Sequence, residues 1–258
     1  MPRYHVEILQ PTSLLSEVGN AQASFERIWA GIPKNRPRRL WHFLPEQGLF
    51  VKGRMARWNL SRSNYMRSRR LFTERRALAG LAALGLPVPE VVAVGVERRA
   101  GIATRSWLML RLFEHAVDLE RYLLDGLDAP GSSRRQAVLE AVGRLVAQLH
   151  GAHAYHRDLS TRNVLLRLDA DVPQTYLIDC PNAKLAPLRC TEPKLRRGDL
   201  FRITRSCRRN GATPEEIEQL LVAAEAPDRP HLHAAVDRSL ESGGRRLLRN
   251  EVWMVTGR

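Results

Sequence analysis

The chain has 258 residues, of which 44% are hydrophobic, so it is long enough to bury the core of one two-lobed domain. No apolar run approaches the roughly 18 residues of a membrane-spanning helix. The first residues also lack the apolar core of a secretion signal, and we therefore expect a cytoplasmic protein. The formal net charge of +14 favours an anionic partner: nucleic acid, a membrane surface or a phosphorylated substrate.

Arginine supplies nearly all of this charge, because only four of the 41 basic residues are lysines. Codon usage in a GC-rich genome would explain such an excess, but arginine also binds phosphate through paired hydrogen bonds. The arginines concentrate in residues 54–76 and 189–209. Cys180, Cys190 and Cys207 form no CxxC pair, which favours reduced thiols over a disulfide framework or a zinc site.

The N-terminal part contains one ambiguous segment and two predicted strands. Late in residues 1–30, apolar side chains recur with helical spacing, which predicts a short amphipathic helix or an irregular arm. Residues 33–39 form a basic turn. Residues 40–44 and 48–52 are predicted strands joined by a short turn, and no glycine-rich GxGxxG motif precedes Lys52.

Lys52 ends the second strand, and Glu74 follows it after 22 residues. Glu74 lies in a predicted helix over residues 68–84 and is the only acid between Lys52 and Glu90. A lysine at a strand end is often simply solvent-exposed. Lysine is rare in this chain, however, which favours a position that needs a compact ammonium group. We therefore expect an ion pair between Lys52 and Glu74.

Two buried strands are predicted next, at residues 91–96 and 106–110, after which residues 111–114 leave the sheet. Residues 119–124 form a predicted short helix. Residues 134–150 form a long amphipathic helix that leads directly to the most informative part of the sequence.

That part is residues 155–166, with the sequence Tyr-His-Arg-Asp-Leu-Ser-Thr-Arg-Asn-Val-Leu-Leu. His-Arg-Asp-Leu followed by three residues and an asparagine is typical of a phosphoryl-transfer catalytic loop. This reaction needs a carboxylate that orients the attacking hydroxyl and accepts its proton. It also needs an amide oxygen a few residues later, which holds a metal ion against the phosphates. Asp158 and Asn163 fit these two roles. A second metal carboxylate should follow the next apolar strand, and Asp179 does so, 21 residues after Asp158.

Three helices are predicted after this segment. One passes through residues 199–205, and a second opens with Thr213-Pro214-Glu215-Glu216, the sequence of a capping box with proline in the first turn. Residues 231–241 form a predicted final helix, and a basic tail follows at residues 245–249.

The order Lys52, Glu74, His156-Arg157-Asp158, Asn163 and Asp179 resembles the protein-kinase superfamily over about residues 40–225. The chain looks most like a small bacterial branch that phosphorylates lipopolysaccharide core sugars, the heptose kinases and the 3-deoxy-manno-octulosonic acid kinases. The chain is compact and lacks the glycine-rich loop. Where a protein kinase has Phe-Gly and a long activation segment, Asp179 is followed by Cys-Pro-Asn-Ala.

The resemblance implies an α+β, two-lobed protein-kinase-like fold, with a small, mainly antiparallel β lobe and a larger helical lobe. Residues 1–258 would form a single kinase-like domain. The small lobe with its N-terminal arm would occupy residues 1–110, the hinge 111–114 and the large lobe 115–258.

The resemblance also implies a nucleotide site for ATP. Lys52 would hold the phosphates with Glu74 as its partner, and hinge backbone groups at Arg111 and Phe113 would bind the adenine.

In the catalytic loop, the resemblance implies that Asp158 is the base and that Asn163 and Asp179 hold Mg²⁺ or Mn²⁺. His156 would form structural hydrogen bonds rather than act in catalysis. Asp199 would be the helix aspartate that braces the loop, although an ordinary helix N-cap explains it almost as well.

Several alternative functions remain open at the sequence level. Small-molecule phosphotransferases of the aminoglycoside or choline type usually carry His-Gly-Asp, and their acceptor pockets are commonly acidic. A protein kinase would have the missing activation segment. A nucleic-acid-binding module fits the charge, but the basic runs lack interleaved aromatic residues, so we expect no nucleic-acid partner. A pseudokinase scaffold is a further alternative, although all five nucleotide and metal positions are present.

The expected acceptor is a hydroxyl of the lipopolysaccharide core or of another anionic glycan. The two arginine clusters would bring the protein to the cytoplasmic face of the inner membrane as a peripheral protein. The sequence predicts no particular oligomeric state.

Overall fold

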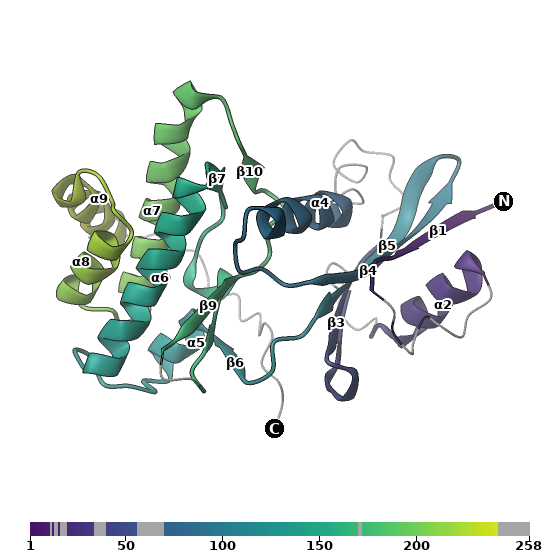
Figure 1. Ribbon diagram of the computed structural model, residues 1–258, viewed down its shortest axis with the longest axis horizontal. Coiled ribbons are helices and arrows are strands. Elements are labelled where there is room, and N and C mark those ends of the chain that lie inside the picture. Colours follow the sequence, from purple (N-terminus) through teal and green to yellow (C-terminus); the bar gives the residue numbers. More distant parts are fainter. Residues whose placement is uncertain are drawn as a thin grey trace. The chain divides into compact units, whose positions relative to one another are not determined.

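The computed structural model of the protein describes residues 1–10, 12, 15, 20–33, 40–55, 70–169 and 172–241. The chain divides into two compact units. Unit 1 comprises Met1–Ala82 and Pro89–Glu114, and unit 2 comprises Ala83–Val88 and His115–Arg258. Unit 1 contains the largest sheet together with α2 (Ala21–Gly31) and most of α4 (Arg70–Ala83), whereas unit 2 contains the longest helices (Figure 1).

Unit 1 is built on a five-stranded sheet in the order β1-β4-β5-β3-β2, in which all neighbours are antiparallel. The four strands predicted from residue 40 onwards are confirmed, and β4 and β5 extend further into their shared hairpin. The strands are β1 (Arg3–Ile8), β2 (Leu40–Leu44), β3 (Leu49–Met55), β4 (Val91–Arg99) and β5 (Ile102–Arg111), with a 3-10 turn η1 (Pro45–Gln47) between β2 and β3.

The expectation of a helix or an irregular arm over residues 1–30 is wrong for the beginning of the chain. Arg3–Ile8 form β1, which pairs with β4 from Arg3↔Arg98 to Ile8↔Ala93. Tyr4 and Val6 pack against the buried core of unit 1. The chain therefore begins as an edge strand of the sheet.

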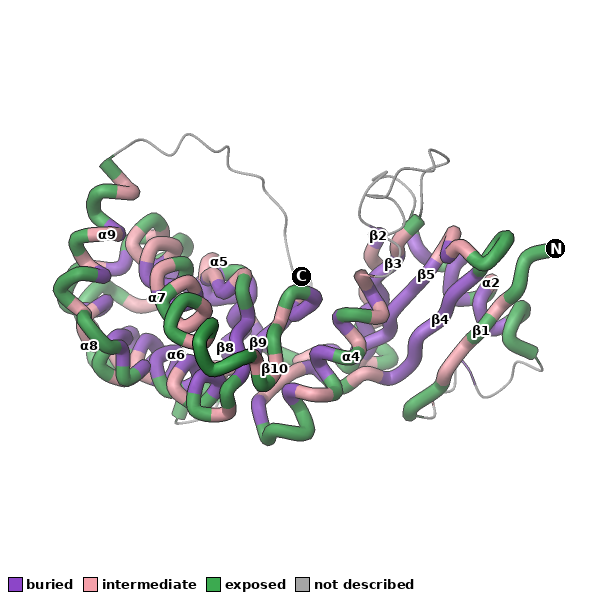
Figure 2. Tube along the Cα trace, turned by 90° about the horizontal axis from the view of Figure 1, so that it is seen from above, coloured by how far each residue is buried: buried purple, intermediate pink, exposed green. Residues whose placement is uncertain are grey.

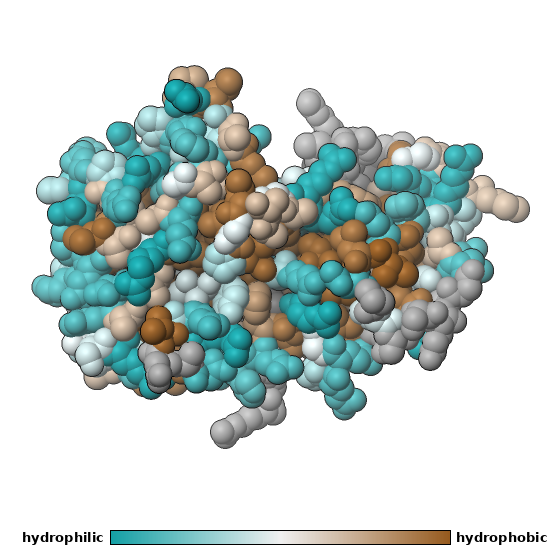
Figure 3. Space-filling model, viewed as in Figure 1, coloured by the Kyte–Doolittle hydropathy of each residue, from teal (hydrophilic) through white to brown (hydrophobic). Residues whose placement is uncertain are grey.

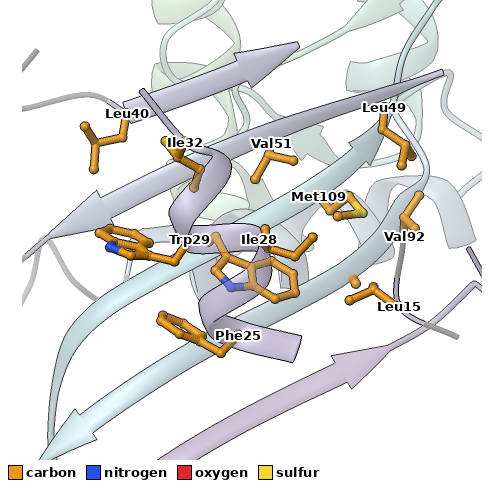
Figure 4. Close-up of a cluster of buried hydrophobic side chains, with 12 residues drawn as sticks. Leu15, Phe25, Ile28, Trp29, Ile32, Leu40, Leu49, Val51, Val92 and Met109 are labelled. Carbon is orange, nitrogen blue, oxygen red and sulfur yellow. The ribbon is translucent and has the colours of Figure 1, made fainter. Parts of the chain in front are cut away.

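The helix expected later in this segment is confirmed as α2 (Ala21–Gly31), which covers one face of the sheet. Asn20 caps it, because its side chain accepts a hydrogen bond from the backbone N–H of Ala23. Figure 4 shows Phe25, Ile28 and Trp29 of α2 lying among buried strand residues. Each such side chain contributes about 1.5–3 kcal/mol when it leaves water.

One glycine allows a fully buried tryptophan of this core to fit. Gly95 on β4 pairs with Trp107 on β5, and the indole lies where a Cβ of residue 95 would be. That Cβ would stand 2.3 Å from Trp107 Cε2, a separation that no side chain tolerates. Glycine is required here for close approach rather than for backbone freedom.

Arg105 on β5 joins α2 to the sheet. Its guanidinium group forms ion pairs with Glu26 of α2 and with the buried Glu97 of β4. It also lies over the rings of Phe25 and Trp29, at 5.3 and 5.4 Å from their centroids. We call Arg105, Glu26 and Glu97 the arginine latch of unit 1.

In the residues that the structure describes, unit 2 combines five helices with two small sheets, ordered β6-β8-β9 and β10-β7. The predicted helices at 119–124, 134–150 and 231–241 and the hairpin after the catalytic loop are confirmed. The elements are β6 (Ala116–Asp118), α5 (Leu119–Leu124), α6 (Ser133–Gly151), β7 (Ala154–Tyr155), η2 (Thr161–Asn163), β8 (Val164–Arg167), β9 (Gln174–Leu177), β10 (Lys184–Leu185), η3 (Arg189–Thr191), α7 (Glu192–Arg209), α8 (Pro214–Ala223) and α9 (Arg229–Glu241).

Helix α6 is the buried centre of unit 2, whereas α9 is exposed along much of its length (Figure 2). Helix α6 packs tightly on α8 at Gly143, where a Cβ would come 2.4 Å from the Leu220 carbonyl oxygen. The predicted capping box opens α8: Thr213 and Glu216 exchange side-chain and backbone hydrogen bonds. Glu216 also forms a fully buried ion pair with Arg135 of α6.

The visible face of unit 2 is mainly hydrophilic, with isolated hydrophobic residues (Figure 3). Among the described residues, no helix is both long enough and apolar enough to cross a membrane. All three cysteines are free thiols, as expected, and burial raises the pKa of Cys207 to about 12. The basic tail at residues 245–249 lies outside the described residues.

Candidate active site

Lys52 and Glu74 form the predicted ion pair in unit 1. The Lys52 Nζ lies 2.6 Å from the Glu74 Oε1, and the two side chains are only 9% and 2% exposed. Lys52 alternates along β3 with Leu49 and Val51, which belong to the core beneath α2. Its side chain therefore leaves β3 on the opposite face of the sheet.

Helix α4 (Arg70–Ala83) supplies the glutamate. Leu71, Glu74 and Leu78 are all buried, and their spacing of three and four residues places them on one side of the helix. Moving two charges out of water costs free energy that their mutual attraction often only offsets. A buried pair such as this one is therefore weak evidence for a role in stability and favours a role in binding. Residues 68 and 69 of the predicted helix lie outside the described residues.

The backbone of the catalytic loop in unit 2 is held by the side chain of Asp199. This carboxylate is fully buried in α7, and it accepts hydrogen bonds of 2.7 Å from the backbone N–H groups of both His156 and Arg157. Helix α7 begins at Glu192, so Asp199 lies inside it and the N-cap interpretation is wrong. These contacts join Asp199 to the loop backbone, and its role as a brace in catalysis stays a prediction.

His156 connects the loop to the strand that precedes Asp179. Its Nδ1 accepts from the backbone N–H of Asp158 at 3.3 Å, and its Nε2 lies 2.9 Å from the Ile178 carbonyl oxygen. Together these contacts require the tautomer with the proton on Nε2. The imidazole is 1% exposed, which suits a structural group rather than a catalytic one.

Asn163 and Asp179 lie at the same end of the β8–β9 pair. Val164 pairs with Leu177, and the backbone N–H of Ile178 donates to the Asn163 carbonyl oxygen at 3.0 Å. The Asn163 amide nitrogen donates to the Asp158 carbonyl oxygen at 2.8 Å. This bond ties Asn163 to the backbone of Asp158 and orients its amide group.

Two residues of this region have left-handed backbone conformations. Arg157 has a φ of 66° and Asp179 a φ of 54°. Such conformations cost a non-glycine residue of the order of 1 kcal/mol and persist where the surroundings impose them. Here Asp199 fixes the amide of Arg157. The strained backbone thus lies directly beside both carboxylates that the sequence analysis singled out.

The residues present fit a hard divalent cation. Asn163 offers an amide oxygen and Asp179 a carboxylate, and Mg²⁺ is commonly held by one or two such groups together with substrate phosphates. Asp158 is partly exposed.

The predicted hinge residues belong to unit 1. The backbone N–H of Arg111 donates to the Glu90 carbonyl oxygen at 2.9 Å, and that of Leu112 donates to the Gly48 carbonyl oxygen at 2.8 Å. Both amides are thus used inside the unit. Phe113 is partly buried, and its assignment to the adenine site stays a prediction.

Sequence reasoning missed a second attachment of the loop. The backbone N–H of Thr161 donates to Ser206 Oγ at 3.0 Å, and the Asn210 side chain donates to Thr161 Oγ1 at 2.8 Å. Ser206 follows Asp199 by seven residues, and Asn210, the C-cap residue of α7, follows it by eleven. This helical spacing is the signal that could have found them, because it places all three on one side of the helix.

Comparison with known proteins places the chain among lipopolysaccharide kinases. The model of the lipopolysaccharide kinase (Kdo/WaaP) family matches residues 46–223. A 3-deoxy-D-manno-octulosonic acid kinase of Haemophilus influenzae (strain 86-028NP) is 32% identical over 133 residues, which are 51% of this chain and 52% of that protein. The corresponding kinase of Pasteurella multocida (strain Pm70) is 34% identical over 110 residues, 43% of each chain. The match thus spans about half the length of these curated relatives.

A solved structure described as "WaaP in complex with acyl carrier protein" has a TM-score of 0.68 with this chain at 22% sequence identity. The superposition covers 92% of this chain and 98% of the chain in that structure. This likeness confirms the predicted kinase-like α+β fold. The family match covers more than half of the chain and includes Lys52, Glu74 and the whole catalytic loop. The chain therefore belongs to the lipopolysaccharide kinase (Kdo/WaaP) family.

Proposed function

We propose that the protein transfers a phosphoryl group from ATP to a sugar hydroxyl of the lipopolysaccharide inner core. The observation that carries the proposal is the catalytic loop of unit 2, in which Asp199 accepts hydrogen bonds from the backbone N–H groups of both His156 and Arg157. The curated relatives, named as 3-deoxy-D-manno-octulosonic acid kinases, support this class of acceptor.

In this mechanism Asp158 is the catalytic base. Its backbone is fixed twice, by the contact of its N–H with His156 and by the contact of its carbonyl oxygen with Asn163. The carboxylate orients the acceptor hydroxyl and accepts its proton as the oxygen attacks the terminal phosphorus of ATP. His156 moves no proton, because both ring nitrogens are engaged in the backbone contacts described above.

Mg²⁺ or Mn²⁺, held by Asn163 and Asp179, would neutralise the negative charge of the nucleotide phosphates. Lys52 is the proposed phosphate ligand of unit 1, and Glu74 orients its ammonium group. Residues 111–114 are the proposed hinge between a small lobe (1–110) and a large lobe (115–258), with Arg111 and Phe113 beside the adenine.

A protein kinase and a small-molecule phosphotransferase are the alternative functions for the same catalytic loop. The family match and the curated relatives both favour a lipopolysaccharide acceptor instead. The proposed place of action is the cytoplasmic face of the inner membrane, where that acceptor would be met.

The test combines a deletion strain with the purified protein. Deletion should remove one phosphate from the core oligosaccharide, a loss of about 80 Da for a phosphate ester. The purified protein with ATP and Mg²⁺ should restore it, and excess chelator should stop the transfer.

Asp158→Ala should lower the rate about a hundredfold or more, because it removes the base. Asp169→Ala is the matched control, since Asp169 is an exposed aspartate paired with Arg167 in the loop after β8. An unchanged core mass, together with rapid phosphorylation of a peptide or a small metabolite, would reject the lipopolysaccharide acceptor.

A further inference from the structure

Two arginines of unit 2 contact Asp199, the residue that holds the backbone of the proposed catalytic loop. The backbone N–H of Arg157 donates to Asp199 Oδ1 at 2.7 Å, and the Arg202 Nη1 lies 3.9 Å from the same oxygen. Arg157 directly precedes Asp158 in the chain. Arg202 lies on α7, one turn after Asp199. We call Arg157 and Arg202 the loop arginine pair.

Asp199 makes no hydrogen bond with Arg202. Its two oxygens already accept short hydrogen bonds from the loop, and a separation of 3.9 Å is too long for a third. The Arg202 side chain is 46% exposed, so its guanidinium retains access to solvent. Gly198 makes room for it, since a Cβ there would stand 3.0 Å from Arg202 Nη1.

Arg157 is exposed as well, although its backbone is fixed in a left-handed conformation. Its Nη1 has a long contact of 3.5 Å with the Asn182 carbonyl oxygen, in the segment that follows Asp179. No ion pair joins Arg157 to an acid within the described part of the chain. A fixed backbone under an accessible guanidinium is suited to binding a ligand that arrives from solvent.

The acids of α7 leave this surface positive. Glu192 contacts His153, and Asp199 is buried, whereas seven lysines and arginines lie on the same helix. Arg196 and Arg208 of this set are engaged, with the Glu225 carbonyl oxygen and with Asp237 respectively. Arg202 is the member of this set that lies beside Asp199, and Arg157 adds a further positive charge directly before Asp158 in the chain.

We propose that Arg157 and Arg202 bind an anionic group of the acceptor and thereby position its hydroxyl at Asp158. The inference rests on the proposed function and adds to it a determinant of acceptor specificity. Guanidinium groups bind carboxylates and phosphates through paired hydrogen bonds, which fixes direction as well as distance. An octulosonic acid offers a carboxylate on the acceptor sugar itself, and a neighbouring lipopolysaccharide residue offers a phosphate.

The experiment measures transfer to core glycolipid purified from the deletion strain. Arg157→Gln and Arg202→Gln should each raise the KM for the glycolipid about tenfold to a hundredfold, because each removes hydrogen bonds between charged groups. The KM for ATP should stay unchanged. Arg202→Lys should recover part of the affinity.

Arg209→Gln is the matched control, because Arg209 is an exposed arginine at the end of the same helix. It removes the same charge from α7 and should behave as wild type. If the KM for the glycolipid rises equally in all three glutamine variants, the effect comes from the general positive charge of the surface. That result would overturn the proposed site.

Two modified acceptors separate the sources of the anion. If the pair binds the sugar carboxylate, reducing that carboxyl to an alcohol should raise the KM of wild type to the level of the arginine variants. If the pair binds a neighbouring phosphate, enzymatic dephosphorylation of the glycolipid should do so. Wild-type KM values for both modified acceptors would overturn the inference.

Failure of the proposed function gives a different result. Wild-type protein would then transfer no phosphate to any form of the glycolipid, and the inference would fall with it. Normal transfer by wild type, loss of transfer in Asp158→Ala, and unchanged KM values in both arginine variants would reject the arginine pair alone.

Discussion

At the scale of single residues, Lys52 tests whether the buried ion pair of unit 1 serves the nucleotide. Lys52→Arg keeps the charge but replaces a compact ammonium group by a larger planar group beside Glu74. We expect a KM for ATP raised about tenfold or more, since removing a hydrogen bond to a charged group costs about 1.5–3 kcal/mol.

Lys184→Arg is the control, because Lys184 is exposed on β10. Wild-type kinetics in Lys52→Arg would make Lys52 a structural partner of Glu74 and remove it from the nucleotide site. A lowered melting temperature with normal kinetics would lead to the same conclusion.

Asp199 allows a second test at this scale. Asp199→Asn leaves one carboxamide oxygen for two backbone N–H groups, and its own amide hydrogens face one of them. A buried donor without a partner costs about 1–3 kcal/mol. We expect faster amide hydrogen exchange at residues 156–158 and a kcat lowered about tenfold or more.

Asp125→Asn is the matched control, because Asp125 is an exposed aspartate at the C-cap of α5 that pairs with Arg121 of that helix. Its exchange and its kcat should stay at wild-type values. Slow exchange at residues 156–158 in Asp199→Asn would show that the loop keeps its conformation without this carboxylate.

The residues of the candidate site were predictable to the extent that their spacing reflects chemistry. One loop has to place Asp158 at the acceptor hydroxyl and Asn163 at the metal ion, which fixes the interval between the two residues. The sequence alone therefore indicates both roles. The contacts of Thr161 with Ser206 and Asn210 depend on how α7 packs against the loop. The helical spacing after Asp199 places Ser206 and Asn210 on one side of the helix but does not identify Thr161 as their partner. The loop arginine pair has the same origin, since Arg202 is one of many arginines until the fold places it beside Asp199.

At the scale of elements, the arginine latch determines how α2 is held on the sheet of unit 1. Hydrogen bonding from Arg105 lowers the pKa of Glu26, which is partly exposed. Burial alone would raise the pKa of Glu97, but hydrogen bonds from Arg105, Arg99 and Thr104 outweigh it and lower that pKa. Both carboxylates thus have lower pKa values in the folded chain than the unfolded value of about 4.3.

A lowered pKa in the folded state stabilises the fold above the unfolded pKa, and this contribution is lost as the pH falls through the folded pKa. Arg105→Gln should therefore lower the melting temperature at neutral pH, by about 2–4 °C for each kcal/mol lost. The difference from wild type should shrink as the pH falls from about 6 to about 3.

Intrinsic tryptophan fluorescence can follow this unfolding, because Trp29 and Trp107 lie in the core beside the latch. Arg76→Gln is the control, since Arg76 is exposed on α4. A difference between Arg105→Gln and wild type that stays constant across the pH range would show that the carboxylates do not titrate through the latch.

Elements with strong periodicity were predictable, and short ones were not. The helices α5 and α8 follow from their apolar spacing and from the capping box. Strands β7 and β10 have two residues each and exist only because the chain on either side brings them together. Strand β1 does carry a signal, the alternation of Tyr4, Val6 and Ile8, but its partner β4 lies far along the sequence.

At the scale of the whole molecule, the main property is the net positive charge, which ion pairs inside the fold do not remove. The net charge of +14 cannot be neutralised internally by 27 acids against 41 basic residues. One predicted arginine cluster, residues 54–76, lies largely outside the described residues, which resume at Arg70. The other, residues 189–209, corresponds to η3 and α7 in unit 2.

This charge predicts binding to anionic membrane surfaces that depends on salt. Each basic residue near such a surface contributes about 1 kcal/mol. Screening shortens the range of this attraction from about 30 Å at 0.01 M salt to about 3 Å at 1 M. The protein should therefore sediment with vesicles that contain phosphatidylglycerol at low ionic strength and should be released as salt is added. Vesicles of phosphatidylcholine alone should bind little at any salt concentration. Equal binding to both vesicle types, or binding that resists high salt, would mean that apolar contacts rather than arginines hold the protein at the membrane.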